Sequence, residues 1–452
     1  MSSSRTVALK FAGGSSDNGA LARAAAAQAI SAVLHDGRSL KAVLAESLKN
    51  IPDVRDRALV EAICFHALRH LRRYRHALKQ WMDKPLPARE HSIESLLLAG
   101  LAQLDALKLP THAAVSATAE AARLLRRPAF VGLVNALLRR ASREPWPIID
   151  NPEIAHSYPD WLVARLCTDW PGDWEAMLVA GNTIAPSWLR VNARVAERSA
   201  YAKQLRDMGI DAQAPEAPAH ALRLDQGVAP EQLPGWKDGL VSVQDAAAQL
   251  AVAALAPRAG ERVLDACCAP GGKSAAMLEI ADIELVALDN DAQRLTRAES
   301  TLLRLRLLNR LTPRPILRAA DAGDLVAWWD GNPFDAILLD APCSATGIVR
   351  RQPDIKWHRR ESDLVALTAM QDRLLDALWR TLKPGGRLLY ATCSILRAEN
   401  SERITAFLAR TGDAVEIPLD ARYGRAVEPG HQRMPGEDGM DGFFYGLLHK
   451  TG

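Results

Sequence analysis

The feature that most constrains the fold is an alternation, after Asp245, of short apolar runs with segments of helical spacing. The apolar runs predict strands at Arg262–Asp265, Glu284–Leu288, Pro315–Leu317, Asp335–Leu339, Gly386–Tyr390 and Phe443–Leu448. Strands that alternate with helices are typical of a doubly wound α/β sheet, whose helices cover both faces. Ligands of such sheets bind beyond the carboxyl ends of the strands. The residues that follow each predicted strand are therefore the first candidates for chemistry.

The rest of the chain has a different texture. From about Leu21 to Arg140 it is rich in Ala, Leu and Arg, with apolar residues at three- and four-residue steps, which predicts an all-α bundle. A region with five tryptophans, several prolines and one alternating stretch, 188–192, predicts a small α+β domain. We therefore expect a multidomain chain: a flexible tail at 1–20, a helical domain at 21–148, a connecting α+β domain at 149–240 and an α/β domain at 241–452.

Charge is distributed unevenly along the chain, although the net charge is only +3. Residues 1–150 hold 22 Lys and Arg against 13 Asp and Glu, whereas the remaining residues hold 34 against 40. A basic domain joined to a more acidic one fits a polyanion-docking module tethered to a catalytic domain, although a solvated helix surface produces the same count. The candidates for phosphate contact are nine arginines: Arg69, Arg72, Arg73, Arg75, Arg123, Arg126, Arg127, Arg139 and Arg140.

Several broad classes are disfavoured. No run of 18 apolar residues could span a bilayer, and no basic segment followed by a long apolar stretch opens the chain, so we expect no membrane association and a cytoplasmic location. Six cysteines in 452 residues do not make a disulfide framework, and no Cys-x-x-Cys or His-x-x-x-His pair accompanies them. We expect free thiols, no metal site and a monomer.

The loop after the first predicted strand has the character of a ligand cradle. Asp265 is followed by Ala266 and then by Cys267, Cys268, Ala269, Pro270, Gly271, Gly272 and Lys273, before a helix. The two glycines allow backbone N–H groups to approach a ligand, and the helix N-terminus favours an anionic group. The spacing matches neither the Gly-x-Gly-x-x-Gly fingerprint nor a Walker loop, which weakens both nucleotide interpretations.

Two further acids follow the next strands. Asp289 lies about 20 residues past the glycine turn, where an acid accepts hydrogen bonds from the ribose hydroxyls of an adenosine. Asp321, after the third strand, is placed to meet an adenine edge. Either acid alone could be a helix N-cap, and Asp289 alone would also fit NAD. Their occurrence at successive strand ends favours a bound adenosine.

Two thiols emerge at equivalent places after the fourth and fifth strands. One strand continues into Asp340-Ala341-Pro342-Cys343-Ser344, and the other into Thr392-Cys393-Ser394. A lone cysteine after a strand is usually a small buried hydrophobe, but two beside an adenosine-type pocket favour chemistry. A thiolate that adds to carbon 6 of cytosine makes carbon 5 able to accept a methyl group. Such a base has to be unpaired or flipped to be reached, and Asp340 would contact its nitrogen edge.

These motifs resemble those of the NOL1/NOP2/Sun group of RNA cytosine-5 methyltransferases. The residues around Arg350 and Arg351, the stretch 353–357 and the C-terminal 441–444 are similar to its bacterial RsmB (Sun) branch, which methylates 16S ribosomal RNA. The resemblance implies a NusB-like N-terminal domain and a C-terminal Rossmann-like class I methyltransferase domain that uses S-adenosyl-L-methionine.

The resemblance also implies roles for the candidate residues. Cys393 is the expected nucleophile, and Cys343 is expected to assist proton removal or product release. The expected cofactor site consists of Cys267, Cys268, Ala269, Pro270, Gly271, Gly272, Lys273, Asp289, Asp321 and Asp340. One departure is Cys268, where the family usually has alanine, a small-for-small change.

Three alternatives stay open from sequence. A non-catalytic RNA-binding or ribosome-assembly factor would have no reason to keep both Cys343 and Cys393. An amino-group methyltransferase would place Asn/Asp-Pro-Pro-Tyr after the fourth strand, where this chain has Asp-Ala-Pro-Cys. A nicotinamide dehydrogenase would need the glycine fingerprint that the loop after Asp265 lacks.

Overall fold

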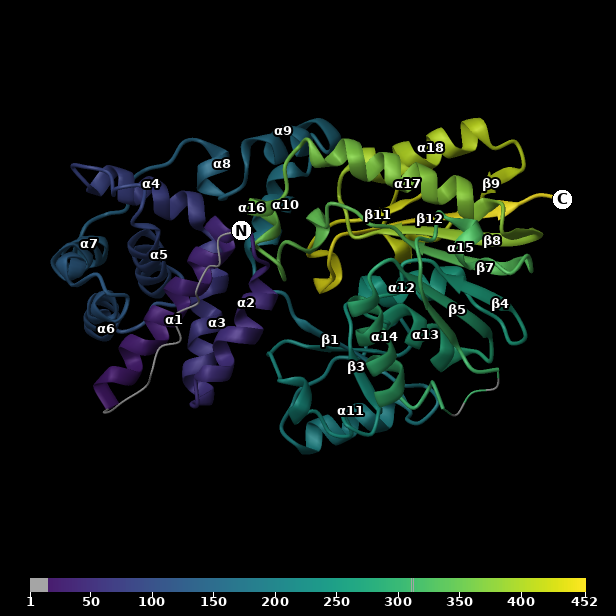
Figure 1. Ribbon diagram of the computed structural model, residues 1–452, viewed down its shortest axis with the longest axis horizontal. Coiled ribbons are helices and arrows are strands. Elements are labelled where there is room, and N and C mark those ends of the chain that lie inside the picture. The colour runs from purple at the N-terminus through teal and green to yellow at the C-terminus, as the bar shows by residue number, and fades with distance from the viewer. Residues whose placement is uncertain (1–14, 310, 312) are drawn as a thin grey trace. The chain divides into compact units, whose positions relative to one another are not determined.

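The chain divides into two compact units in the computed structural model, which describes residues 15–309, 311 and 313–452 (Figure 1). The first unit ends at Val163 and also contains Gln352–His358, and the second comprises Ala164–Arg351 and Arg359–Gly452. The expected tail at 1–20 lies mainly outside the described residues. Its last part, however, already belongs to the first helix, α1 (Ser15–Asp36).

The first unit is helical, and its described residues contain no strand, as the sequence predicts. Its helices are α1, α2 (Leu40–Ser47), α3 (Val54–Arg69), α4 (Leu71–Trp81), α5 (His91–Asp105), α6 (Thr111–Leu124), α7 (Val131–Arg143), α8 (Pro152–Ala155) and α16 (Ile355–His358), and α9 (Asp160–Asp169) contains the boundary. The side chains of Ser39 and Asp53 accept backbone N–H bonds at the starts of α2 and α3, the usual N-cap arrangement.

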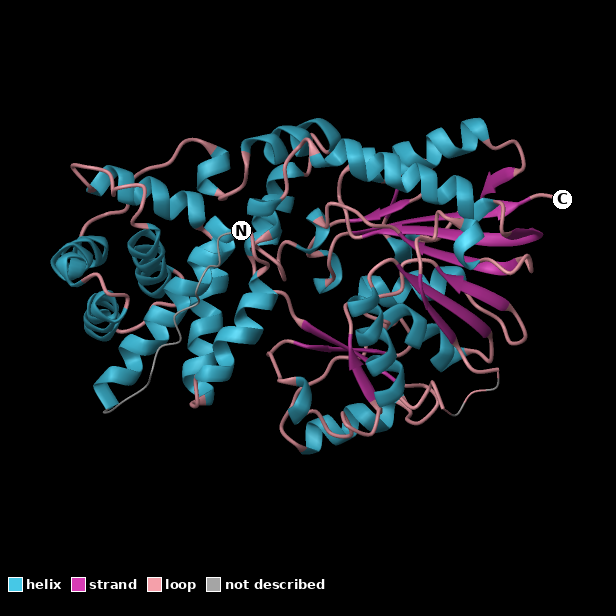
Figure 2. Ribbon diagram, in the orientation of Figure 1, coloured by secondary structure: helices cyan, strands magenta, loops and turns pink. Residues whose placement is uncertain are grey.

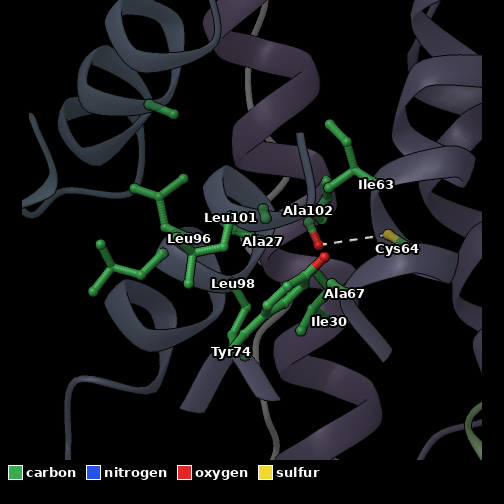
Figure 3. Packing of buried hydrophobic residues seen from close by; sticks show 14 of the residues in the cluster. Ala27, Ile30, Ile63, Cys64, Ala67, Tyr74, Leu96, Leu98, Leu101 and Ala102 are labelled. Atoms are coloured by element: carbon green, nitrogen blue, oxygen red, sulfur yellow. Dashed lines mark hydrogen bonds between the residues drawn. The ribbon is translucent and has the colours of Figure 1, made fainter. Parts of the chain in front are cut away.

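The core of this unit forms around α1, which packs against α3, α5 and α6. Much of the buried face of α1 is alanine, and small side chains let neighbouring helix axes approach closely. Ile30 of α1, Ile63 of α3 and Leu98 of α5 belong to the same buried cluster, part of which Figure 3 shows, and all three are fully buried. Cys64 also lies there, and burial raises the pKa of its thiol, so Cys64 is a packing residue.

The segment 352–358 caps two helices of the first unit. The Asp354 carboxylate accepts the Leu40 N–H (3.0 Å) at the start of α2. Lys356 is buried and donates from Nζ to the carbonyl of Arg69 (3.0 Å), the last residue of α3. A side-chain acceptor at a helix N-terminus and a side-chain donor at a C-terminus both satisfy backbone groups that have no partner within the helix. The chain therefore leaves the α/β region and contributes a short structural piece to the helical unit.

A small antiparallel sheet opens the second unit. Its strands β1 (Ser187–Val191), β2 (Ala221–Leu224) and β3 (Val241–Val243) have the order β2-β1-β3, and α11 (Arg198–Asp207) packs against β2. Helix α10 (Trp174–Asn182) precedes β1 in the chain. Leu189 and Val191 face a core shared with Tyr201 of α11. Between them, Arg190 forms a bidentate ion pair with Glu279 (2.7 and 2.9 Å), and both side chains are buried.

The remainder of the second unit is a nine-stranded sheet, whose order is β10-β11-β12-β8-β7-β4-β5-β6, with β9 paired to β12. Strands β4 to β8 are parallel, and β12 lies antiparallel to β8. The strands are β4 (Arg262–Asp265), β5 (Glu284–Asp289), β6 (Ile316–Ala319), β7 (Phe334–Asp340), β8 (Leu382–Thr392), β9 (Ala414–Glu416), β10 (Arg425–Ala426), β11 (His431–Arg433) and β12 (Phe443–Lys450).

Helices cover both faces of this sheet, as Figure 2 shows by the strands lying between two helical layers. Val263 and Leu338 pack with α12 to α14, whereas their neighbours Leu264 and Leu339 pack with α17 and α18. The helices are α12 (Ala246–Leu255), α13 (Gly272–Ile280), α14 (Ala292–Arg304), α15 (Leu325–Trp328), α17 (Asp363–Trp379) and α18 (Ser401–Arg410). Because both faces are buried, the strands are continuous apolar runs, which is the pattern that predicted them.

All six predicted strands occur in the sheet, and the short strands β9, β10 and β11 were not predicted. The six cysteines are free thiols. Among the residues that the structure describes, no helix has the combined length and apolar character that crossing a bilayer requires.

The Arg190–Glu279 pair provides a test of how the small sheet is anchored. Glu279→Gln should lower the free energy of unfolding by about 3–5 kcal/mol, because it leaves the buried Arg190 charge without its carboxylate. Asp282→Asn removes a pair between Arg194 and a largely exposed acid and should cost less than about 1 kcal/mol. Urea unfolding at unchanged m-value measures both, and equal losses in the two variants would contradict the expectation.

Candidate active site

Four parallel strands end at one edge of the large sheet and bring the predicted residues together. The last residues of β4, β5, β7 and β8 are Asp265, Asp289, Asp340 and Thr392. The register pairs Asp265 with Leu338 of β7, and Asp340 with Ala391 of β8. The loops that follow these strands therefore start side by side, at the edge where open α/β sheets bind ligands.

The loop between β4 and α13 is held by its own backbone. The Cys268 N–H donates to the Leu288 carbonyl (2.7 Å), and the Gly271 N–H donates to the Cys268 carbonyl (2.7 Å). Gly271 has a φ of +91°, and a Cβ there would lie 2.8 Å from the Cα of Ala298, so no other residue fits. The first N–H groups of α13 have no intrahelical partner, which suits an anionic ligand group.

Cys267 and Cys268 lie in this loop but are poor nucleophiles. Burial raises the pKa of both thiols, and the carboxylates of Asp265 and Asp289 raise it further. Both sulfurs are therefore protonated near neutral pH, and any part that these residues take in cofactor binding would be steric or through the backbone.

Asp265 is a buried acid with an unused acceptor. The Ser274 hydroxyl donates to its Oδ2 (2.6 Å), whereas its Oδ1 is buried and has no hydrogen-bond partner among the described residues. Burial raises the pKa of this carboxyl to about 7. Buried polar atoms are nearly always hydrogen-bonded, so the arrangement fits a donor group of a bound ligand.

Asp289 ties the glycine loop to the end of β5. Its Oδ2 accepts the Ala269 N–H (3.1 Å), and its Oδ1 accepts the Asp291 N–H (3.1 Å). Only 2% of the residue is exposed. Each carboxylate oxygen has two lone pairs, so both oxygens can still accept a ribose hydroxyl.

Asp321 lies in a more open setting. The Arg373 guanidinium of α17 contacts both of its carboxylate oxygens (3.1 and 2.9 Å), and the Gly323 N–H donates to Oδ1 (2.8 Å). Partial burial opposes ionisation, but these bonds outweigh it and hold the pKa of Asp321 below its ordinary value. Its contact with an adenine remains a prediction, because the ion pair already uses much of the carboxylate.

Lys273 and Asp340 form an ion pair at the centre of the edge. Lys273 Nζ lies 2.6 Å from Asp340 Oδ2, and the side chains are 13% and 28% exposed. Burial disfavours the ammonium, but Asp340 and the nearby Cys393 sulfur outweigh it and raise the pKa of Lys273. The Lys273 Nζ also lies 5.3 Å from the ring centroid of Phe443, a cation–π contact that the sequence did not predict.

Cys343 and Cys393 meet at this edge. Their sulfurs are 3.6 Å apart, which exceeds the disulfide bond length of about 2.05 Å, and each side chain is partly exposed. The hydrogen bond with Cys393, followed by burial, raises the pKa of Cys343 well above its ordinary value. The two thiols are thus brought together, as the strand ends predict, and their environments differ.

One residue of this site was not predicted. Glu399 is fully buried and accepts hydrogen bonds from Ser344 and Ser394, the residues that follow the two thiols. Acids are rarely buried, and nothing in the local sequence separates Glu399 from a surface acid. Its closeness to Cys393 along the chain is the one available signal.

The arginines of the helical unit are largely engaged in ion pairs. Six of the nine predicted phosphate contacts pair with an acid of the same unit: Arg72, Arg73, Arg75, Arg123, Arg127 and Arg140. A phosphate would have to compete with these acids. RNA contact by these arginines therefore remains a prediction.

One group in the helical unit has the residue types of a metal site. His35, His91 and Glu94 could each offer one ligand atom. The Arg75 guanidinium, however, holds Glu94 through two bonds (2.8 and 3.2 Å), and a cation so close disfavours a metal ion. The expectation of no metal stays a prediction.

The raised pKa of Asp265 has a consequence for stability. The carboxyl titrates near pH 7 in the folded protein and near pH 3.8 in the unfolded chain. The stability that the protonated carboxyl contributes to the folded protein is therefore fully present below about pH 4 and is lost as pH rises through 7. Asp265→Asn keeps an acceptor for Ser274 and cannot ionise. Its unfolding free energy relative to the unsubstituted protein should rise between pH 4 and pH 8, by at most about 4 kcal/mol. A relative stability that does not change with pH would show that the carboxyl is not perturbed.

Comparison with known proteins places each part of the chain in a family. The model of the 16S rRNA methyltransferase RsmB/F matches residues 252–449, the ferredoxin-like domain of RsmF/B-like methyltransferases matches 158–231, and the NusB family matches 20–143. These matches confirm the predicted NusB-like, α+β and methyltransferase parts.

Individual proteins are similar over nearly the full length. "Ribosomal RNA small subunit methyltransferase B" of Xanthomonas campestris is 52% identical and covers 96% of this chain and 98% of its own. Its namesake from Xylella fastidiosa is 51% identical, with coverage of 96% and 99%. The crystal structure of PH0851 shares the fold, with a TM-score of 0.80 at 21% identity, and covers 98% of this chain and 100% of its own. The chain therefore belongs to the RsmB/F family of 16S rRNA methyltransferases.

Proposed function

We propose that this methyltransferase transfers a methyl group from S-adenosyl-L-methionine to carbon 5 of a cytosine in 16S ribosomal RNA, with Cys393 as the covalent nucleophile. The proposal rests mainly on one observation. The Cys343 and Cys393 sulfurs lie 3.6 Å apart at the edge of the sheet where the glycine loop also begins. The name of the Xanthomonas relative supports ribosomal RNA of the small subunit as the substrate.

The chemistry explains why a thiol is needed. Carbon 5 of cytosine is not nucleophilic enough to accept a methyl group unaided. Addition of the Cys393 sulfur to carbon 6 forms an S–C6 bond and moves the electron pair of the 5,6 double bond towards carbon 5. After carbon 5 has gained the methyl group, a base, in this proposal the deprotonated Cys343 sulfur, takes the carbon-5 proton, the double bond re-forms and the S–C6 bond breaks. Cys393 leaves as a thiolate, and no oxidant or reductant is required.

The neighbours of Cys393 support its role as the attacking thiol. Lys273 lies within electrostatic reach of Cys393, since the Cys393 sulfur contributes to the raised pKa of Lys273. The raised pKa of Cys343 keeps its proton on that sulfur in the resting pair. Cys343 lies beside the adduct and is placed to assist product release, and it can remove the carbon-5 proton once it has lost its own proton to solvent. Asp340 orients Lys273 and offers a carboxylate for the nitrogen edge of the base.

The residues at the edge fit the proposed cofactor. S-adenosyl-L-methionine supplies an electrophilic methyl group when it is bound. Asp289 can accept from ribose hydroxyls, and the unpartnered Oδ1 of Asp265 suits a donor group. The N-terminus of α13 suits the carboxylate of the methionine part. Asp321 would hold the adenine edge, in competition with Arg373.

The RNA has to present the target cytosine unpaired, because a base inside a helix is out of reach of a thiol at a strand end. The NusB-like residues 20–143 would contribute phosphate contacts, with an affinity that falls as salt rises. Action as a monomer in the cytoplasm belongs to the same proposal.

Trapping with 5-fluorocytosine tests the covalent step. Fluorine at carbon 5 cannot leave as a proton, so the protein, the cofactor and a fluorinated rRNA fragment should give an adduct that survives denaturation. Cys393→Ala should abolish this adduct and lower methylation on the order of 10⁴-fold or more, as expected when a covalent nucleophile is removed. Cys343→Ala should instead accumulate adduct on unmodified RNA, because release is impaired. Denaturing gels and methyl transfer to RNA measure both.

Cys167→Ala is the control, since Cys167 lies in α9, outside the proposed site. It should leave the adduct and the methylation rate unchanged. An adduct that persists in Cys393→Ala would refute the assignment of the nucleophile.

A further inference from the structure

A buried carboxylate links the two loops that carry the thiols. Glu399 ends a short 3₁₀ turn (Arg397–Glu399), and none of the residue is exposed. Its Oε1 accepts from the Ser344 N–H (2.7 Å) and its Oε2 from the Ser344 hydroxyl (2.5 Å). The same Oε2 accepts from the Ser394 hydroxyl (2.6 Å). One carboxylate therefore binds the residue after Cys343 and the residue after Cys393.

Further bonds stiffen the same junction. Gln371 of α17 donates one amide nitrogen to Glu399 Oε1 (3.2 Å) and to the carbonyl of Pro342 (2.9 Å), the residue before Cys343. The Gly347 N–H donates to the Cys393 carbonyl (2.8 Å). The Tyr390 hydroxyl donates to the backbone carbonyl of Glu399 (2.6 Å), which anchors the turn to β8. Each loop is thus tied to Glu399 within one residue of its thiol.

Among the residues that the structure describes, the hydrogen-bond donors to the Glu399 carboxylate are all neutral groups. They are one backbone N–H, two hydroxyls and one amide. A carboxylate buried without a cation among its donors is a costly way to join two loops, because desolvation opposes the charge. The carboxylate instead links the two loops, because one rigid planar group accepts hydrogen bonds from both of them in fixed directions.

We propose that Glu399 is a positioning residue that sets the separation of the Cys343 and Cys393 sulfurs during the methylation cycle. The inference rests on the proposed function, in which Cys393 forms the adduct and Cys343 assists its release. Glu399 itself touches neither sulfur, and it acts through Ser344 and Ser394. Release depends on Cys343 lying at the right distance from the adduct on Cys393, so it is the step most sensitive to this carboxylate.

Two conservative substitutions distinguish the effect of the length of the Glu399 side chain from the effect of its charge. Glu399→Gln removes the charge and keeps the length, and its amide nitrogen can donate to the Ser344 and Ser394 hydroxyls, which can turn to accept. Glu399→Asp keeps the charge and shortens the side chain by one methylene, so the carboxylate cannot reach both loops. Positioning predicts that Glu399→Gln keeps turnover within about 3-fold, whereas Glu399→Asp loses about 10- to 100-fold.

The distinguishing readout is the covalent adduct on unmodified RNA. In Glu399→Asp the adduct should accumulate as it does in Cys343→Ala, although the Cys343 thiol is present, because release slows more than attack. A merely structural defect would lower adduct formation and turnover together. Glu402→Asp, the same change at an exposed acid three residues away, is the matched control and should behave as the unsubstituted protein.

Ser344→Ala provides a second test in case the Glu399→Asp protein does not fold. It removes one hydroxyl of the Cys343 loop, keeps the carboxylate and predicts a smaller accumulation of the same adduct. Folded Glu399→Asp and Ser344→Ala proteins that both show no accumulation would refute positioning, as would a loss of turnover in Glu399→Gln that Glu399→Asp does not share. If the fluorinated adduct survives Cys393→Ala, the proposed function itself fails. If the fluorinated adduct needs Cys393, and the adduct on unmodified RNA accumulates in Cys343→Ala but in neither Glu399→Asp nor Ser344→Ala, only the role of Glu399 fails.

Discussion

The parallel pairing of β7 with β8 is the constraint on which the rest of the site depends. Their register places Asp340 opposite Ala391, and the Ala341 N–H donates to the Ala391 carbonyl (2.8 Å), so the two chains leave the sheet together. Cys343 follows one of these positions by three residues and Cys393 the other by two. Backbone bonds between strands thus bring two thiols from residues fifty positions apart to 3.6 Å. Without this pairing, neither thiol would have a chemical partner.

The same edge concentrates charge in a region of low exposure. Asp265 and Lys273 both lose most of their contact with water; Asp265 accepts a hydrogen bond from Ser274 of α13, and Lys273 pairs with Asp340 at the end of β7. Buried ionisable groups with perturbed pKa values cluster at functional sites, because chemistry needs charge in a place where water does not screen it. The stability lost by burying these groups is offset elsewhere, by the two apolar layers on either face of the sheet.

Much of this was predictable from sequence, because each strand is an apolar run and the residue at its end is polar. Asp289 and Asp340 were identified in this way. The start of β8 was not, because the Pro384-Gly385 pair is typical of a turn, yet here it lies in a strand whose pairing with β7 is irregular. The ion pair between Lys273 and Asp340 and the burial of Glu399 could not be predicted from the sequence either. Such contacts arise from tertiary packing, and no local period or spacing encodes them.

The most direct test of the account is to locate the covalent bond. The protein would be trapped on 5-fluorocytosine RNA with S-adenosyl-L-methionine, digested with protease and nuclease, and sequenced by tandem mass spectrometry. The account predicts that a methylated fluorocytidine is attached to the peptide that contains Cys393, at its sulfur. Attachment at Cys343 or Cys267, or a methylated RNA that never carries a peptide, would contradict it.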